Sequence, residues 1–564
     1  MAAWYDNAIV YQVYPKSFKD SNGDGIGDLA GITQKLDYFT QLGVNTLWLN
    51  PIFQSPQVDN GYDVSDFYAI DPQLGTLADF KALVAAAHAR GLRIVLDMVL
   101  NHTSDQHPWF QGALQGPDNP YYDYYIWADG HDGQKPNNWG SFFGGSVWTQ
   151  HPTVADRYYF HLFERRMPDL NWRNPQVRAE MIKVAKYWAD LGIDGLRLDA
   201  FIHLAKADLH QNYPTDGAAP VVAEGMFANL PAVQPYLGEF VAGVKADHPD
   251  LFILGEAASA TVNLAADYTR PNANMADAVI SFRYFPTKPR SKRDKVPMDY
   301  QPQSLDWLSF KQVMTDWQQT LLPPRRLTLY WGNHDMARLA TRVGSHRYPQ
   351  RSAKSLATLM YLQRGLPVLY YGDELGLSNG TLASLAAFGD PTVTAFADAA
   401  KAAGWSAERI LENVNATHKL TARAPLPWSD GVGHGFSTVA PWLAVNQNGT
   451  PVSQQMADPD SVWHHYQQLF ALKQQPLFTS GAWQLQNWAP WLYAYTRTLA
   501  NETALVLVNT TDTKHTVTLP STWAGEPNQQ LTVGTVQQAA DQLTLSPWSS
   551  TILTIKQKEN RNDC

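Results

Sequence analysis

Three carboxylate side chains closely follow apolar runs that have the length of β-strands. They are Asp199, Glu256 and Asp335. A carboxylate beside buried apolar strands costs free energy unless it is paired or protonated. We therefore expect the three groups to share one pocket, where one carboxylate can attack a substrate and another can donate and then accept a proton.

Arg197 lies two residues before Asp199 in the same predicted strand, so both side chains point to one face. Its cation would hold Asp199 in the ionised form. Glu256 has apolar neighbours, and an anionic Asp335 close to it would further favour its protonated form. The pattern predicts one ionised carboxylate next to one protonated carboxyl group.

Eight apolar stretches, each separated from the next by room for a helix, must position these groups. They are Ala8–Tyr14, Val44–Asn50, Leu92–Val99, Asp194–Leu198, Leu251–Leu254, Asp277–Phe282, Leu327–Trp331 and Leu366–Tyr371. Helical spacing of apolar residues predicts helices over Gly31–Leu42, Leu77–Arg90 and Pro175–Leu191. This alternation predicts an α/β protein with a (β/α)8 TIM barrel, whose catalytic groups lie at the C-terminal ends of the strands.

Two long segments interrupt the barrel, and a different pattern follows it. We assign residues 1–102 and 173–479 to the barrel and residues 103–172 to an inserted subdomain after the third strand. A second insertion or irregular extension runs from Asn379 to about Val445. Residues 480–564 alternate in polarity and predict a C-terminal antiparallel β-sandwich domain. Its expected strands are Trp491–Thr498, Thr503–Asn509, Lys514–Leu519 and Thr551–Ile555.

The composition narrows the classes of partner. The net charge is −9, which argues against a nucleic-acid-binding protein. The single cysteine, Cys564, allows no intrachain disulfide. We find no signal peptide and no apolar run long enough for a membrane span, so we expect no membrane partner and a cytoplasmic location. The chain is expected to be a monomer or a small homo-oligomer.

The four segments around the polar strand ends, in their order along the chain, resemble the signature regions of the α-amylase superfamily of glycoside hydrolases. They are Asp97–His102, Gly195–Ala200, Gly255–Ala257 and Asn333–Asp335. Met167–Asn171 resembles a further signature of that family. The Val10–Pro15, Asp20–Asp28 and Asp59–Asp63 segments are similar to the branch of oligo-1,6-glucosidases, dextran glucosidases and α-glucosidases. The resemblance covers nearly the whole chain.

The resemblance implies a retaining mechanism with Asp199 as nucleophile, Glu256 as general acid/base and Asp335 as the carboxylate that binds the distorted sugar. Such a mechanism needs its two carboxylates roughly 5–5.5 Å apart. The residues implied in substrate binding are Asp59, Tyr62, His102, Phe143, Phe163, Arg197, His334 and Arg423. In exo-acting members, Asp59 and Arg423 match the pair that closes the pocket around the terminal glucose.

The Asp20–Asp28 loop resembles the structural cation loop of this branch. Oxygen ligands at alternate positions suit a hard cation, and we expect Ca2+, with Mg2+ as an alternative. The expected ligands are Asp20, Asn22, Asp24, Asp28 and the carbonyl of Ile26. The alternative is a turn that binds no metal. No organic cofactor is expected.

Three departures from α-1,6-specific members favour α-1,4 activity on maltose and malto-oligosaccharides. Ala200 stands where those members commonly have Val, and Met167 and Ala257 also depart from their pattern. An oligo-1,6-glucosidase is the near alternative. A transglycosylase or isomerase would use the same covalent intermediate. The basic run Lys288–Lys295 is typical of a solvated loop but would also suit a phospho-disaccharide hydrolase. A catalytically dead sugar-binding scaffold is the non-enzymatic alternative.

Overall fold

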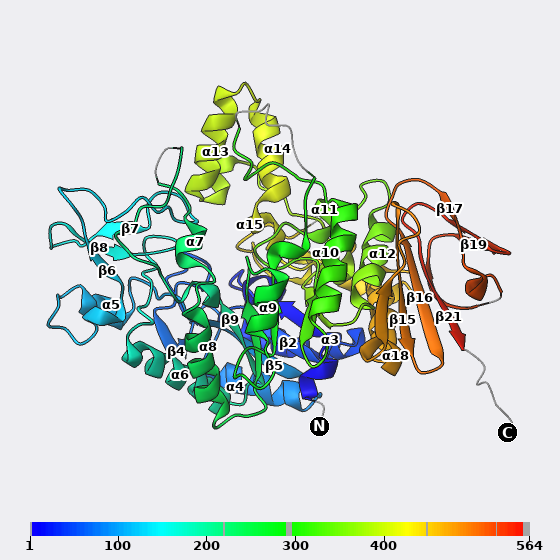
Figure 1. Ribbon diagram of the computed structural model, residues 1–564, viewed down its shortest axis with the longest axis horizontal. Coiled ribbons are helices and arrows are strands. Elements are labelled where there is room, and N and C mark those ends of the chain that lie inside the picture. The colour runs from blue at the N-terminus through cyan, green and yellow to red at the C-terminus, as the bar shows by residue number, and fades with distance from the viewer. Residues whose placement is uncertain (1–2, 218–219, 289–295, 447–448, 526, 557–564) are drawn as a thin grey trace.

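The computed structural model describes residues 3–217, 220–288, 296–446, 449–525 and 527–556. Its centre is a closed barrel of eight parallel strands in the order β1-β13-β12-β11-β10-β9-β5-β2, which confirms the predicted fold class (Figure 1). The strands are β1 (Val10–Val13), β2 (Thr46–Leu49), β5 (Arg93–Val99), β9 (Gly195–Asp199), β10 (Phe252–Glu256), β11 (Ala278–Ile280), β12 (Arg326–Leu329) and β13 (Leu366–Tyr370). Each lies within one of the eight predicted stretches or extends it by one or two residues.

Two of the predicted barrel helices begin at residues that cap them. In α4 (Leu77–His88), Thr76 and Asp79 form a capping box. In α6 (Pro175–Asp190), Asn174 caps the helix and Pro175 occupies its first turn. The single helix predicted over Gly31–Leu42 is wrong in detail. Asp28 caps an earlier helix, α2 (Leu29–Gln34), and the chain leaves helical geometry at Lys35 before α3 (Leu36–Leu42).

The catalytic unit contains two further strands and a set of further α-helices, which connect the barrel strands or follow them in the chain. They are β3 (Phe53–Gln54), β4 (Asp66–Ile70), α1 (Pro15–Phe18), α7 (Glu224–Phe227), α8 (Val233–Lys245), α9 (Val262–Tyr268), α10 (Trp307–Thr320), α11 (Leu339–Arg342), α12 (Pro349–Tyr361), α16 (Val452–Ala457), α17 (Val462–Lys473) and α18 (Pro476–Thr479). Within the described residues, no helix is long and apolar enough to cross a membrane.

The segment between β5 and β9 forms a small unit of its own beside the barrel. It holds the helix α5 (Pro108–Ala113) and a three-stranded antiparallel sheet in the order β6-β8-β7. The strands are β6 (Trp127–Asp129), β7 (Trp148–Gln150) and β8 (Arg157–Phe160). Aromatic rings pack against one another inside it: Phe110 contacts Tyr125 and Tyr159, and Trp148 contacts Phe160.

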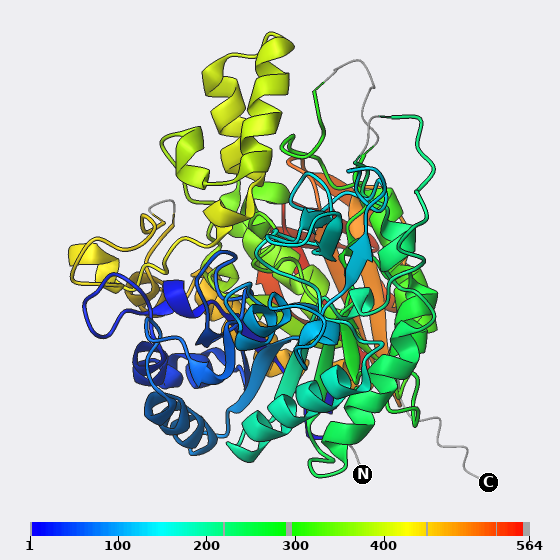
Figure 2. The same ribbon diagram turned by 90° about the vertical axis from the view of Figure 1, so that its left-hand side faces the viewer.

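The segment after β13 is helical and not an irregular extension. The helices α13 (Pro391–Ala402), α14 (Ala407–Thr417) and α15 (Lys419–Ala422) follow one another, and α13 and α14 share a small core with Phe388. In Figure 2 this yellow-green arm stands out from the body of the molecule. The arm contacts the segment that follows β11. The ring of Tyr300 in that segment stacks on the ring of His418 in the arm, with ring centres 5.6 Å apart.

The C-terminal domain is antiparallel, as predicted. One sheet has the order β14-β15-β16-β21-β18 and the other has the order β17-β20-β19, with apolar side chains between them. Four strands match the predicted ones: β15 (Leu492–Leu499), β16 (Glu502–Asn509), β17 (His515–Thr518) and β21 (Ser550–Lys556). Four were not predicted, because their outward faces are polar and weaken the alternation: β14 (Ala482–Leu485), β18 (Asn528–Val533), β19 (Val536–Ala539) and β20 (Gln542–Leu545).

Candidate active site

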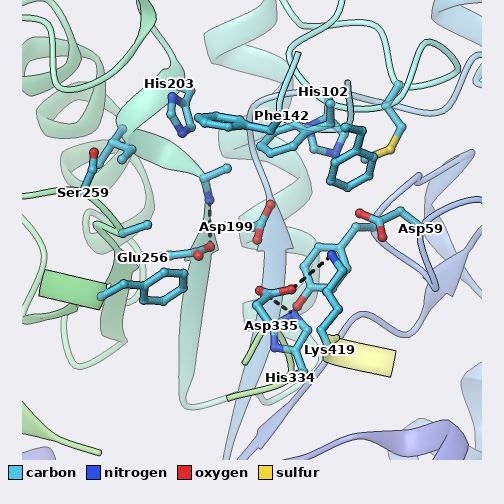
Figure 3. A pocket seen from close by; sticks show the side chains of 18 of the residues that line it. Asp59, His102, Phe142, Asp199, His203, Glu256, Ser259, His334, Asp335 and Lys419 are labelled. Carbon is cyan, nitrogen blue, oxygen red and sulfur yellow. Dashed lines mark hydrogen bonds and ion pairs between the residues drawn. The ribbon is translucent and has the colours of Figure 1, made fainter. Parts of the chain in front are cut away.

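The three predicted carboxylates meet at one end of the barrel. Asp199 is the last residue of β9 and Glu256 is the last residue of β10, and these two strands are neighbours in parallel register. Asp335 follows β12 after a short loop. In the view of Figure 3, Asp199 lies between Glu256 and Asp335. All three line one cavity of about 580 Å³.

A single buried guanidinium group joins the two carboxylates at the strand ends. Arg197 Nη1 lies 2.6 Å from Asp199 Oδ1 and 2.8 Å from Asp97 Oδ1, and its Nη2 lies 2.5 Å from Glu256 Oε2. Parallel register places Asp97 opposite Arg197 on the neighbouring strand β5. Three carboxylates surround this one cation, so the cluster carries excess negative charge. That excess favours a proton on one of the three carboxyl groups.

The pKa of the Asp199 carboxyl is raised well above its usual value. Burial is the main cause, and the charges of Glu256 and Asp97 add to it, while Arg197 opposes it. We predicted from the sequence that Arg197 would keep Asp199 ionised; in the structure burial and Glu256 work against that cation. The pKa of Asp199 is therefore set by burial and the neighbouring carboxylates, which together outweigh the one cation.

Asp335 lies in a different electrostatic environment. Lys419 Nζ and Arg423 Nη2 lie 3.4 and 3.2 Å from Asp335 Oδ1, and His334 Nε2 lies 3.2 Å from its Oδ2. Burial alone would raise the pKa of Asp335, but His334, Lys419 and Arg423 together hold it below its usual range. Asp335 is thus a permanent anion at neutral pH, suited to accept hydrogen bonds from substrate hydroxyls.

Aromatic and imidazole rings form the wall around these carboxylates. Tyr62 stacks on His334 with ring centres 5.2 Å apart, and its hydroxyl donates to Asp97. Phe163 packs edge-on against His102 at 5.2 Å. The Nε2 atom of His102 is buried and has no hydrogen-bond partner among the described residues. Burial lowers the pKa of His102 to about 4, so the imidazole is neutral and available to a polar ligand.

Asp59 and Arg423 both line the cavity, as the resemblance implied, but the structure describes no direct bond between them. Arg423 is buried and donates from Nε to the carbonyl oxygen of His334 at 2.8 Å as well as to Asp335. Burial raises the pKa of Asp59, and the charges of Lys419 and Arg423 oppose that shift. Phe143 lies near them with Lys419 over its ring at 5.1 Å.

The chain matches models of two known protein domains. The family model for the α-amylase catalytic domain matches residues 12–481, and that for the C-terminal domain of the α-amylase SusG matches residues 492–552. The chain belongs to the α-amylase family of glycoside hydrolases.

Similar proteins match over nearly their whole length. An oligo-1,6-glucosidase of Parageobacillus thermoglucosidasius is 36% identical over 98% of this chain and 99% of its own. Among solved structures, a family GH13_31 enzyme is 49% identical with a TM-score of 0.90, covering 98% of this chain and 100% of its own. The trehalose-6-phosphate hydrolase of Bacillus licheniformis is 33% identical with a TM-score of 0.90, covering 99% and 100%.

Some residues that line the pocket of this α-amylase family member were not predicted. Lys419 lies four residues before Arg423, and that spacing could have suggested a second cation on the same side of the chain. His203 follows Asp199 by four residues in a short 3-10 helix, and Phe142 packs against it at 5.6 Å. Nothing in the sequence singles out Arg283, which reaches the pocket from the loop after β11.

In the predicted cation loop, the donor oxygens accept hydrogen bonds from the loop itself. Asp20 accepts the amides of Gly23 and Gly25 at 2.7 and 2.9 Å. Asp24 accepts the amide of Ile26 at 2.8 Å, and Asp28 caps α2. The oxygen-only donor set suits Ca2+ chemically. However, no group of three or more His, Cys, Asp and Glu in the described part of the chain could hold a metal ion. Calcium binding stays a prediction.

Most of the basic run Lys288–Lys295 lies outside the described residues, since positions 289–295 are not described. The idea that this run recognises a substrate phosphate is therefore untested by the structure.

Proposed function

We propose that the protein is a retaining, exo-acting α-glucosidase that releases glucose from the non-reducing end of short α-glucosides. The observation that carries this proposal is the contact of Asp199 and Glu256 with one guanidinium group, that of Arg197. Two carboxylates that bond to the two terminal nitrogens of one guanidinium group lie close together. Double displacement requires such proximity. The α-glucosidase and oligo-1,6-glucosidase type of the relatives supports the same class.

In the first step, Asp199 attacks the anomeric carbon while Glu256 protonates the glycosidic oxygen, so the leaving sugar departs as an alcohol. In the second step, Glu256 removes a proton from water, which attacks the same carbon and releases Asp199. For these steps Glu256 must carry the proton and Asp199 must be ionised when the substrate is bound. Positive charge that develops on the sugar ring next to Asp199 favours this distribution.

The electrostatics at the far end of the pocket support exo action. Asp335 is surrounded by Lys419, Arg423 and His334, and Asp59 also lies within the field of Lys419 and Arg423. Charged groups arranged in this way can hold the hydroxyls of a terminal glucose by charge-assisted hydrogen bonds. We infer that this end of the pocket binds the non-reducing terminus.

The residue after the nucleophile supports a preference for α-1,4 linkages. Ala200 lines the pocket and adopts a left-handed conformation, with φ at 46°. Its methyl group leaves space beside Asp199 that a larger side chain would fill. The second candidate is an oligo-1,6-glucosidase, which the name of the 36% identical relative favours.

Product analysis tests the proposal. The enzyme is incubated with maltose, isomaltose and the 6-phosphates of both, and the sugars and the anomer first released are followed by NMR. We expect α-glucose from maltose. Cleavage of isomaltose alone would support the oligo-1,6-glucosidase, and a requirement for phosphate would support a phospho-disaccharide hydrolase. A new disaccharide as the main product would indicate a transglycosylase or isomerase, and no product at all would indicate a sugar-binding scaffold.

Three further properties are proposals of the same kind. We propose that the Asp20–Asp28 loop binds Ca2+ as a structural ion, on the strength of its oxygen donors. A cytoplasmic location and a monomeric or small homo-oligomeric state also stay predictions from the sequence.

A further inference from the structure

His418 stands at the junction of α14 and α15 in the helical arm, next to a cation of the catalytic pocket. It is the residue before α15, and Lys419 is the first residue of that helix. The side chain of His418 is only 6% exposed. Its ring stacks on that of Tyr300 at 5.6 Å and meets the ring of Phe388 edge-on at 5.0 Å. This packing restricts how the imidazole can be oriented.

Both ring nitrogens of His418 have a partner, and the partners fix its tautomer. The amide of Leu420 donates to Nδ1 at 3.0 Å, so Nδ1 carries no proton. The proton of the neutral ring therefore lies on Nε2, which donates to Asp390 Oδ2 at 3.1 Å. One nitrogen thus satisfies an amide that the first turn of α15 leaves free, and the other binds the arm.

Asp390 connects this contact to α13. Its Oδ1 atom accepts the amide of Thr392 at 2.8 Å and so caps α13. Burial alone would raise the pKa of Asp390, but hydrogen bonds from His418 and Thr392 lower it to about 2. The group is an anion at neutral pH and a strong acceptor. One carboxylate therefore ties the start of α13 to the residue that caps α15.

The two cations near Asp335 differ in their other contacts. Arg423 is buried and also donates to the carbonyl oxygen of His334 at 2.8 Å. The side chain of Lys419 is 28% exposed, and its ammonium group lies 3.4 Å from Asp335 Oδ1. A long side chain gives up conformational freedom when it holds such a contact. A backbone fixed at the start of α15 leaves fewer positions for Lys419 and so favours the contact.

We propose that His418 is a positioning residue that holds Lys419 against Asp335 by capping α15. His418 is not among the described residues that line the catalytic pocket, so it acts through Lys419, which does line it. The inference rests on the proposed function in one respect, because it takes Asp335 as a group that binds the substrate.

A double-mutant cycle with a 4-nitrophenyl α-glucoside tests the proposal. We expect His418→Ala to lower kcat/KM about tenfold, mainly through kcat, because Asp335 is assigned to the distorted sugar. Lys419→Met should lower it at least as much. The double variant should be slower than Lys419→Met by no more than about twofold. Losses that multiply in the double variant would show that His418 acts independently of Lys419 and would overturn the proposal.

Two variants separate loss of the cap from general damage to the arm. His418→Asn keeps an acceptor for the amide of Leu420, so kcat/KM should recover to within about threefold of the wild type. Ser406→Ala removes the matching cap of α14, where the Ser406 hydroxyl accepts the amide of Arg409 at 3.2 Å. It should behave as the wild type, since none of the described residues that line the catalytic pocket comes from α14. No recovery in His418→Asn, or an equal loss in Ser406→Ala, would contradict the proposal.

Hydrogen exchange measures the cap without reference to activity. The Leu420 amide should exchange at least about tenfold faster in His418→Ala than in the wild type, as followed by mass spectrometry of a peptide that covers residues 419–423. Circular dichroism checks folding. His418→Phe keeps a ring next to Tyr300 and Phe388 but offers no acceptor, and it replaces His418→Ala should that variant fail to fold. Unchanged exchange in a folded variant overturns the proposal.

Failure of the proposed function would be recognised separately, because the wild type would then cleave no α-glucoside. In that case the same cycle is measured as affinity for glucose by titration calorimetry. His418→Ala should weaken glucose binding in the presence of Lys419 and leave it unchanged in Lys419→Met. An equal weakening in both backgrounds would overturn the positioning role.

Discussion

Arg197 Nη1 lies 2.6 Å from Asp199 Oδ1, because the two residues are two positions apart on β9 and point to the same face of the strand. The other arm of the guanidinium reaches Glu256 on β10. Arg197 is 1% exposed at its side chain, so this contact is screened little by water. Asp199 and Glu256, the proposed nucleophile and the proposed acid/base, are therefore coupled through one buried cation.

This coupling predicts severe and separable effects of two substitutions. Asp199→Asn and Glu256→Gln should each lower kcat on maltose by about 10³-fold or more. With a 4-nitrophenyl glucoside, whose leaving group needs no protonation, Glu256→Gln should retain its first step and release a burst of nitrophenol, while Asp199→Asn should not. Stopped-flow absorbance measures the burst. A burst in Asp199→Asn, or wild-type activity in either variant, would contradict the assigned roles.

A larger side chain at position 200 should change the linkage preference. Val at this position adds two methyl groups beside Asp199, and a β-branched residue is strained at the φ of 46° found here. We expect Ala200→Val to lower kcat/KM for maltose about tenfold and to raise the ratio of isomaltose to maltose cleavage. Ala200→Ser, which is nearly the size of alanine, is the control. An unchanged ratio in Ala200→Val would show that the α-1,4 preference does not depend on this residue.

Stability should fall on the acid side because of buried neutral histidines. Burial, with help from Lys354, lowers the pKa of His465 from 6.5 to about 3. The unfolded chain therefore binds a proton below pH 6.5 that the folded protein does not bind, and stability is lost as the pH falls toward 3.

Replacing His465 isolates its share of this loss. Between pH 7 and pH 4.5, we expect the free energy of unfolding to fall by about 2 kcal/mol less in His465→Gln than in the wild type. Urea titrations at both pH values measure the difference. Gln537→Ala, at an exposed side chain that binds no proton, should leave the acid-side loss unchanged. Equal losses in His465→Gln and the wild type would mean that His465 is protonated in the folded protein.

Calcium should stabilise the protein through the Asp20–Asp28 loop. The donors of this loop now accept hydrogen bonds from its own amides, so binding requires them to exchange those partners for the ion. We expect excess Ca2+ to raise the Tm by a few degrees over protein treated with EDTA. Asp24→Ala should remove this increase, whereas Asp118→Ala, at an exposed aspartate elsewhere, should keep it. An increase that survives in Asp24→Ala would place the ion at another site.

The sequence by itself determined the barrel and the candidates for its active site. Strand-length apolar runs alternate with helical segments, and this periodicity is a property of each segment's own residues. Asp199, Glu256 and Asp335 could be singled out as candidates because each stands shortly after such a run, where a barrel places its catalytic groups. The strands β14 and β18–β20 were not predicted, because many of their residues are polar and exposed. Which of their faces meets solvent depends on how the two sheets of the C-terminal domain pack.

Only the tertiary structure decided how these groups act on one another. That Arg197 binds Glu256 as well as Asp199 depends on the register of β10 against β9, which no local pattern encodes. Lys419 approaches Asp335 because the chain returns to the barrel after α14, 84 positions along the sequence. Charge interactions act through space and grow as water is excluded, so the opposite pKa shifts of Asp199 and Asp335 follow from packing and not from the order of residues.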